Sequence, residues 1–404
     1  MKYILKLAMA NIKRATRRTV LTFMVLGVGI GMYIVVECML AGMEVMSFRN
    51  IIDFQTGHIK IHSAEYTEEK PYALSNLIGN YETVMSEISK VPFVKGVAAR
   101  AFFLGEVDNS IDSIPVVITG IDFDNDPSVY SLTNFITGGE YGKDGLLMGS
   151  MLAADLGLKA GDYVYLSFRK EQGAYVSVEK KIAGLIGSSD PGVNSGSVFL
   201  DLKEVLGLFG VEGVTDLAVK VDDIEKVNPY TAELKNKFPA LNIVDWKKAA
   251  EHTILVAQMK GKFSGIIVLF VIVIALVGII NTMLMSVYEK QREIGTLKAL
   301  GMTDKQVHRM FLLEGGLIGV WGGVFGIVFA ALINLYMSTV GFDLDKMMGN
   351  TDLGMSVSGI FRSAWVPAAF VKGFLIGLIA SLFASYYPAK KTTRMQPMEC
   401  LRVK

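Results

Sequence analysis

The sequence predicts an α+β membrane protein with four transmembrane helices, one before and three after a large extracytoplasmic α+β domain. The first observation is composition: of 404 residues, 51% are hydrophobic and 20% are charged, and the mean hydropathy is +0.41. This average is too apolar for a soluble protein and too charged for one that lies wholly in lipid. The second observation is four apolar runs, each long enough to cross a hydrocarbon core as a helix. They are residues 20–43, 263–287, 311–340 and 368–387.

The third observation is an uneven distribution of charge along the chain. Residues 44–258, between the first and second apolar runs, contain 19 basic and 30 acidic residues, whereas the rest contains 21 basic and 9 acidic residues. The basic residues of that remainder lie beside the apolar runs, and short basic flanks stay in the cytoplasm. We therefore expect both termini and the linker between the second and third runs to be cytoplasmic. Residues 44–258 are then expected outside.

The N-terminal segment, residues 1–19, predicts an amphipathic helix on the inner leaflet. It has six basic residues and no acidic residue, and its apolar residues fall on one helical side. The apolar run that follows is longer than the roughly 7–15 residues of a cleavable signal peptide. We therefore expect it to be an uncleaved transmembrane helix.

The extracytoplasmic domain, residues 44–258, alternates strand and helix signals. A β-α-β-β pattern ends near residue 125, and a second β-α-β pattern begins near residue 215. The strands between them are shorter and separated by glycine turns, which predicts an inserted β-rich lobe. No proline occurs from 247 to 262, so a helix is expected to run from this domain into the second apolar run.

No catalytic, cofactor-binding or metal-binding residue is predicted. The segment "TGGEYGKD" has Thr137 and Asp144 where a phosphate-binding loop needs Gly and a hydroxyl residue. The acidic segment "DFDND" at 122–126 lacks the Gly and Glu that complete a calcium loop, which favours an acidic turn. His58 and His62 alternate in a strand pattern with no third ligand, which favours a solvated strand face over a zinc site.

The linker between the second and third apolar runs, residues 289–302, forms a charged elbow. Ile294, Leu297 and Leu300 recur at helical spacing among charged residues. A short helix with an apolar stripe favours docking against a partner, and the alternative is a merely solvated loop.

The corner after this helix has two local signals. Gly301 is placed to end the helix in a left-handed conformation. Thr303, with Gln306 three residues later, has the pattern of a capping box that begins a new helix. A helix, a tight corner and a second helix that enters the third apolar run are therefore expected.

Small residues recur every four positions in the apolar runs, which lets helix backbones approach closely in a membrane. Spacing alone leaves open whether these interfaces slide or are static. The predicted helix-packing glycines are Gly315, Gly319, Gly323, Gly373 and Gly377.

Two segments resemble a known family. Residues 292–326, "REIGTLKALGMTDKQVHRMFLLEGGLIGVWGGVFG", and residues 386–403, "YYPAKKTTRMQPMECLRV", are similar to the FtsX/MacB-type ABC transporter permeases. The arrangement of one apolar run, a large domain and three further runs is also similar to that family.

The resemblance implies a non-catalytic permease subunit that transmits mechanical motion. Residues 44–258 would be a MacB-like, porter-like core domain with its inserted lobe, and residues 259–404 an FtsX-like permease domain. Glu314 matches an acidic position at the start of the family's third span. Residues 289–302 would be the coupling helix, seated on a separate cytoplasmic ABC ATPase subunit. The residues that would couple to the ATPase are Arg292, Glu293, Ile294, Gly295, Leu297, Lys298, Leu300, Gly301 and Met302.

Within the family, the chain looks most like lipoprotein-releasing subunits of the LolC/LolE kind. No fused ATPase domain is expected, and the resemblance is carried by "TGHIKIHSAEY" at 56–66 and "GLLMGSMLAADLGLKAGDYVYL" at 145–166. The implied partners are a second permease subunit, membrane lipid, a lipoprotein cargo and a periplasmic carrier, with no nucleic acid. The implied location is the inner membrane. Two alternatives remain open: a regulator that activates a periplasmic partner, and MacB-like efflux of amphiphiles or peptides.

Overall fold

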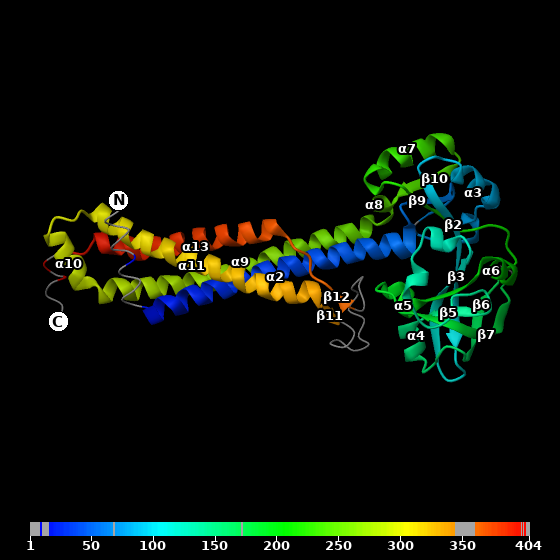
Figure 1. Ribbon diagram of the computed structural model, residues 1–404, viewed down its shortest axis with the longest axis horizontal. Helices are drawn as coiled ribbons and strands as arrows, with labels where there is room; N and C mark the ends of the chain where they lie inside the picture. Colours follow the sequence, from blue (N-terminus) through cyan, green and yellow to red (C-terminus); the bar gives the residue numbers. More distant parts are fainter. Residues whose placement is uncertain are drawn as a thin grey trace. The chain divides into compact units, whose positions relative to one another are not determined.

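The computed structural model describes residues 9, 16–67, 69–170, 173–343, 360–396, 398 and 400. Most of the predicted N-terminal amphipathic helix, residues 1–19, therefore lies outside the described residues. The chain divides into two compact units (Figure 1). The first comprises Met1–Met43, Ala257–Phe342 and Arg362–Lys404, and the second comprises Glu44–Val256 and Asp343–Phe361.

The first unit is built from long helices. Among the residues that the structure describes, four helices are long and apolar enough to cross a membrane: α2 (Thr16–Asn50), α9 (Glu251–Glu289), α11 (Asp304–Thr339) and α13 (Pro367–Thr393). The short helix α10 (Gln291–Ala299) lies between α9 and α11. Each long helix extends beyond its predicted apolar run, because a helical backbone continues into polar sequence that hydropathy does not count. The segment between α11 and α13 contains two short strands, β11 (Phe342–Asp343) and β12 (Ile360–Phe361).

Small residues bring the helices of this unit into close contact. A Cβ added at Gly319 of α11 would lie 2.9 Å from the Ser381 Cβ of α13, and one at Gly323 would lie 2.6 Å from the Phe374 ring. Gly315 meets Ser385 of α13 in the same way. Gly373 and Gly377 of α13 instead face Ile34 and Ile30 of α2. All five predicted packing glycines therefore lie at helix contacts inside this unit.

The second unit contains a ten-stranded sheet in the order β10-β1-β9-β2-β3-β8-β5-β7-β4, with β6 paired to β2 and β7. The strands are β1 (Ile59–Ser63), β2 (Val94–Asp108), β3 (Ser113–Ile121), β4 (Ile136–Gly139), β5 (Leu146–Gly149), β6 (Tyr163–Arg169), β7 (Tyr175–Ile186), β8 (Ser197–Asp201), β9 (Asp216–Val221) and β10 (Leu241–Asp245). A large apolar core lies between these strands and the helices that cover them, and two smaller apolar clusters contain Phe199 and Tyr130.

Short helices connect the strands. The α-helices are α3 (Tyr81–Ser89), α4 (Ser150–Asp155), α5 (Pro191–Gly196), α6 (Leu202–Phe209), α7 (Val227–Lys237) and α8 (Trp246–Ala249). The first irregular helix is a π-helix, η1 (Ile51–Thr56). The 3₁₀ turns are η2 (Leu74–Asn76), η3 (Asp126–Ser128), η4 (Leu132–Phe135) and η5 (Ile224–Lys226).

The predicted strand and helix order of this unit is present, with one difference in how the parts connect. The strands of the predicted lobe do not form a separate sheet, because β3 pairs with β8 and β2 pairs with β6. Strand β2 is long enough for both roles. Its first half pairs with β9, and its second half, from Gly105, pairs with β6.

The prediction of a solvated histidine face is wrong. Strand β1 is an inner strand between β10 and β9. His62 on β1 is only 5% exposed, and its ring stacks on Tyr66 with 3.8 Å between ring centroids. The alternating pattern correctly indicated a strand, but it could not show that the segment around Tyr66 covers the polar side.

Candidate functional site

The charged elbow is the short helix α10 followed by a tight corner. The helix ends at Leu300, and Gly301 has a positive φ of 94°, as predicted. The Gly301 N–H donates to the Lys298 carbonyl and the Met302 N–H donates to the Leu297 carbonyl, both at 3.0 Å. This pair of bonds is the Schellman motif, which satisfies carbonyls that the helix end would otherwise leave free.

The corner passes directly into α11 through the predicted capping box. The Thr303 N–H donates to the Gln306 side-chain oxygen at 2.9 Å. Asp304 supplies a negative charge in the first turn of α11, where the helix dipole favours it. The backbone groups at the end of α10 and at the start of α11 are therefore hydrogen-bonded, so the elbow is a defined structure and not a flexible loop.

The predicted apolar stripe of the elbow does not form a single outward face. Ile294 is buried and Leu297 packs against the same helical core, whereas Leu300 is 80% exposed. At about 100° per residue, Leu300 lies about 120° around the helix from Ile294. Ile294 and Leu297 therefore hold α10 to its own bundle, and of the three only Leu300 is available to a partner.

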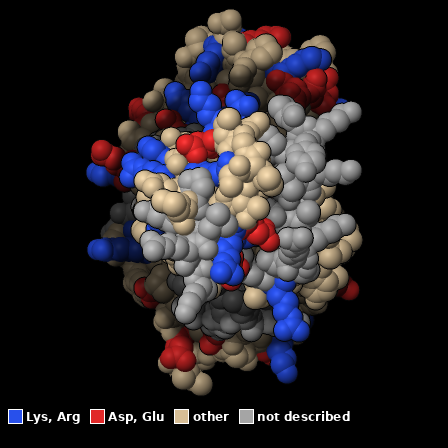
Figure 2. Space-filling view, turned by 90° about the vertical axis from the view of Figure 1, so that its left-hand side faces the viewer, with Lys and Arg blue, Asp and Glu red and all other residues tan. Residues whose placement is uncertain are grey.

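The outward side of α10 is polar. Arg292, Glu293 and Thr296 are exposed, as are Leu300 and Gly301 at the corner. Figure 2 views the end of the molecule that carries α10 and shows basic and acidic side chains interspersed there. A surface of mixed charge at a rigid helix is suited to a partner whose charges are complementary.

Lys298 faces inward, in contrast to the prediction that it contacts a partner. Its side chain is only 6% exposed. Its Nζ donates to the carbonyls of Thr392 and Met395 at 2.9 Å and to that of Thr393 at 3.3 Å. It also forms an ion pair with Asp304 at 2.7 Å. Lys298 therefore caps the C-terminal end of α13, where the helix dipole favours a cation.

A buried charge pair lies where α9 meets α10. Lys290 Nζ lies 3.2 Å from Glu314 Oε1, and Ser286 donates a hydrogen bond to the same oxygen at 3.2 Å. Glu314 and Lys290 are both buried. The family resemblance pointed to Glu314, but the roles of Lys290 and Ser286 follow only from the packing. The elbow is thus tied to α11 by Lys290 and to α13 by Lys298.

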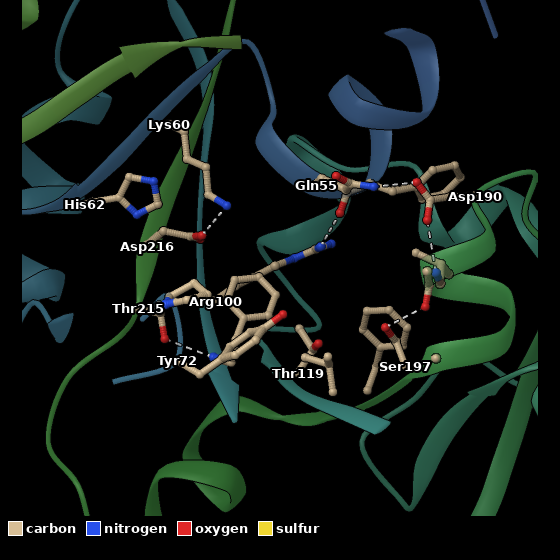
Figure 3. Close-up of a pocket in the computed structure, with 18 of the residues that line it drawn as sticks. Gln55, Lys60, His62, Tyr72, Arg100, Thr119, Asp190, Ser197, Thr215 and Asp216 are labelled. Atoms are coloured by element: carbon tan, nitrogen blue, oxygen red, sulfur yellow. Dashed lines mark hydrogen bonds and ion pairs between the residues drawn. The ribbon is translucent and has the colours of Figure 1, made fainter. Parts of the chain in front are cut away.

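The second unit contains a cavity of about 470 Å³ on one face of the sheet, lined by both apolar and charged side chains (Figure 3). Its floor includes Lys60, which pairs with Asp216 at 2.7 Å, and Arg100, which pairs with Asp126 at 2.8 Å. Burial, together with the nearby Lys60 ammonium, lowers the pKa of His62 to about 4. At neutral pH His62 is therefore uncharged.

These cavity charges are matched within the chain, so they do not by themselves indicate a ligand. Among the residues that the structure describes, no group of three or more His, Cys, Asp or Glu side chains is arranged to hold a metal ion. The pairing of Arg100 with Asp126 was not predicted, because the two residues are 26 positions apart and the acidic segment at 122–126 was interpreted only as a turn.

Known proteins with similar sequences are membrane permeases. Residues 265–397 match the family described as FtsX-like permease C-terminal. The chain is 23% identical over 346 residues to the lipoprotein-releasing system transmembrane protein LolE of Haemophilus influenzae, which covers 82% of this chain and 83% of LolE. It is 24% identical to LolC of Xylella fastidiosa over 273 residues, 65% of each chain.

Two further similarities involve MacB proteins. The macrolide export ATP-binding/permease protein MacB of Bdellovibrio bacteriovorus is 30% identical over 210 residues, 48% of this chain and 29% of that protein. The solved periplasmic region of MacB from Actinobacillus actinomycetemcomitans aligns with 49% of this chain and 93% of that one, with a TM-score of 0.35 and 10% identity. The family match at residues 265–397, together with the LolE, LolC and MacB relatives found by sequence, confirms the resemblance to the FtsX/MacB-type ABC transporter permeases.

Proposed function

We propose that this chain is the membrane subunit that couples ATP hydrolysis, by a separate cytoplasmic ABC ATPase subunit, to motion of an extracytoplasmic domain. In this proposal α10 is the coupling helix, the termini are cytoplasmic, and a second permease subunit completes the transporter in the inner membrane. The chain itself would have no catalytic residues.

The observation that carries this proposal is the attachment of α10. Its inner side is tied to the bundle by Ile294, by the Lys290–Glu314 pair and by the Lys298 contacts with α13. Its outer side presents Arg292 and exposed neighbouring residues. A helix held this way would pass a push from a partner to α11 and α13 instead of yielding as a flexible loop would.

The cargo that we propose is a lipoprotein released from the inner membrane to a periplasmic carrier. The support is the similarity to LolE over most of both chains, together with the similarity to LolC. Efflux of an amphiphilic molecule is a second candidate, favoured by the 30% identity to a MacB protein over about half of this chain.

The first test changes the outer side of the elbow. Arg292→Glu reverses an exposed charge, so it should weaken binding of the ATPase subunit through like-charge contacts without disturbing the fold. Arg362→Glu is the matched control, because Arg362 is also exposed but lies beyond the opposite end of α11. The measurement is recovery of an ATP-hydrolysing subunit with the tagged chain from detergent-solubilised membranes. Equal recovery with both variants would contradict docking at α10.

The second test changes the corner. Gly301→Val places a β-branched residue at a φ of 94°, although an added Cβ would meet nothing within 4 Å. The substitution therefore strains the backbone by about 1–2 kcal/mol without a steric clash. Gly301→Asn is the control, since Asn tolerates the left-handed conformation better. The valine variant should bind the ATPase subunit and hydrolyse ATP but release less labelled lipoprotein from vesicles. Normal release would mean that the corner is only a connector.

A labelled amphiphilic dye loaded into the same vesicles separates the two candidate cargoes. ATP-dependent loss of the dye, with retention of the lipoprotein, would replace lipoprotein release by efflux.

A further inference from the structure

The first long helix continues into the second unit and changes form there. Residues Glu44–Asn50 of α2 belong to the second unit, and the six-residue π-helix η1 follows without a break. Gly57, with a φ of 62°, then turns the chain into β1. A π-helical turn is rare and is commonly found at functional positions. The π-helix at the end of α2 therefore suggests that this segment has a role besides connecting the helix to the sheet.

Two side chains of this segment bind one loop of the inserted lobe. The Asn50 side-chain amide donates to the Ser189 carbonyl at 2.8 Å, and the Ser189 hydroxyl donates back to the Asn50 amide oxygen at 2.6 Å. The Gln55 amide donates to Asp190 Oδ2 at 2.7 Å (Figure 3). Asn50 and Asp190 are buried, so these bonds are shielded from water.

A third attachment comes from the other side of η1. Arg100 on β2 is 1% exposed and donates from Nη1 to the Phe54 carbonyl at 2.7 Å. Its Nε and Nη2 donate to the two carboxylate oxygens of Asp126 at 2.8 and 2.9 Å, and its guanidinium carbon lies 3.3 Å from the centre of the Tyr130 ring. A planar guanidinium fixed by a carboxylate and a ring is a rigid donor. Arg100 therefore holds η1 against β2 while Asn50 and Gln55 hold it against the lobe.

The lobe loop is well placed to pass on a displacement. Asp190 accepts a hydrogen bond from Gln55 on one oxygen and caps α5 with the other, which accepts from the Val193 N–H at 3.0 Å. Helix α5 leads directly into β8, which lies in the sheet between β3 and β5. A movement of η1 is thus connected, through Asp190, to a strand at the centre of the sheet.

We propose that Asn50, Gln55 and Asp190 form a rigid joint through which α2 moves the inserted lobe, and that they are positioning residues for transmission. This inference rests on the proposed function, because it concerns where the motion delivered to the helices enters the extracytoplasmic domain. Residues 50–56 end the helix that carries the displacement, and residues 188–190 begin the segment that receives it.

The experiment breaks the joint and measures both rigidity and release in the full chain. The Asn50→Leu/Gln55→Leu double variant removes the donors and the Asn50 acceptor while keeping side chains of similar size. Gln55→Lys is the conservative variant, because an ammonium still donates to Asp190. Glu44→Gln is the control, since Glu44 is exposed on the same helix. Spin labels are placed at Val45 on α2 and Ala154 on α4, both exposed.

The expected result is a narrow distribution of label–label distances in the parent chain, the control and Gln55→Lys, and a broad one in the double variant. ATP hydrolysis by the assembled transporter should be retained in the double variant. Lipoprotein release should fall by about tenfold or more, because the double variant loses three hydrogen bonds, one of them to the charged Asp190.

Other outcomes overturn the inference. A narrow distribution in the double variant would show that the joint does not depend on these side chains, even if release fell. A broad distribution with normal release would show that rigidity here is not needed for transmission. Failure of the proposed function would be distinguishable, since the parent chain would then bind no ATPase subunit. If no ATPase subunit drives α2, the joint has no motion to transmit, even if the distribution of label–label distances in the parent chain is narrow.

Discussion

Removal of the Lys298 ammonium should loosen α13 from the elbow. Lys298→Met keeps an unbranched side chain of similar length but has no donor. The carbonyls of Thr392, Thr393 and Met395 would then lose the hydrogen bonds that Lys298 now donates. Thr392 is buried, so water cannot readily replace the donor at that carbonyl.

Most of the expected loss of stability comes from the lost hydrogen bonds to these carbonyls and not from the lost ion pair. A hydrogen bond from a charged donor contributes about 1.5–3 kcal/mol, and a cation at a helix C-terminus about 0.3–1 kcal/mol. The side chain of Asp304 is 60% exposed, so its pairing with Lys298 should add at most about 1 kcal/mol. We therefore expect Lys298→Met to destabilise the packing of α13 by about 3 kcal/mol.

The assay compares limited proteolysis and thermal unfolding of the purified chain in detergent. Lys298→Met should expose the segment after α13 to protease, and Lys298→Arg should restore part of the protection, because a guanidinium can donate to the same carbonyls. Lys305→Met is the matched control, since Lys305 is exposed in the first turn of α11. If Lys298→Met and Lys305→Met are equally resistant and equally stable, the assignment of Lys298 as the cap of α13 is wrong.

Two further predictions concern one residue in each unit. Gly319→Leu should prevent α11 and α13 from packing, and it should destabilise the fold by more than the roughly 1–3 kcal/mol typical of overpacked sites. Gly278→Leu is the control and should be nearly neutral, because a Cβ there meets nothing within 4 Å. Equal yields of folded protein by size-exclusion chromatography would contradict this. Because the pKa of His62 is lowered from 6.5 to about 4, the unfolded chain takes up a proton before the native one does, so stability should fall as the pH drops through this window. Between pH 7 and pH 5 the free energy of unfolding should fall by about 2 kcal/mol, which lowers the unfolding midpoint of the second unit by roughly 4–8 °C. His62→Gln should remove most of this loss. An equal loss in both chains by calorimetry would refute the assignment of the loss to His62.

Features with local causes could be predicted from the sequence. The four long apolar helices follow from the lengths of their apolar runs. The corner at Gly301 and the capping box at Thr303 involve bonds between residues at most five positions apart. Each of these patterns lies within a single helix or turn, so the sequence contains all the groups that decide it.

The use of the charged residues could not be predicted, because their partners are distant in the sequence. Lys298 was expected to contact a partner protein, but its acceptors lie 94 to 97 residues away on α13 and just beyond it. The apolar stripe was expected to face outward, but Ile294 is needed to pack α10 onto its own bundle.

The same limit applies in the second unit. His62 is covered by Tyr66, and the joint between Asn50 and Ser189 connects residues 139 positions apart. Periodicity shows that one side of a helix or strand is apolar, but it does not identify what covers that side. A buried charge is stable only beside a partner of matching geometry. The sequence therefore determined the long apolar helices, the order of strands and helices along the chain, and the elbow. The tertiary structure decided which polar side chains are paired inside the chain and which remain on its surface.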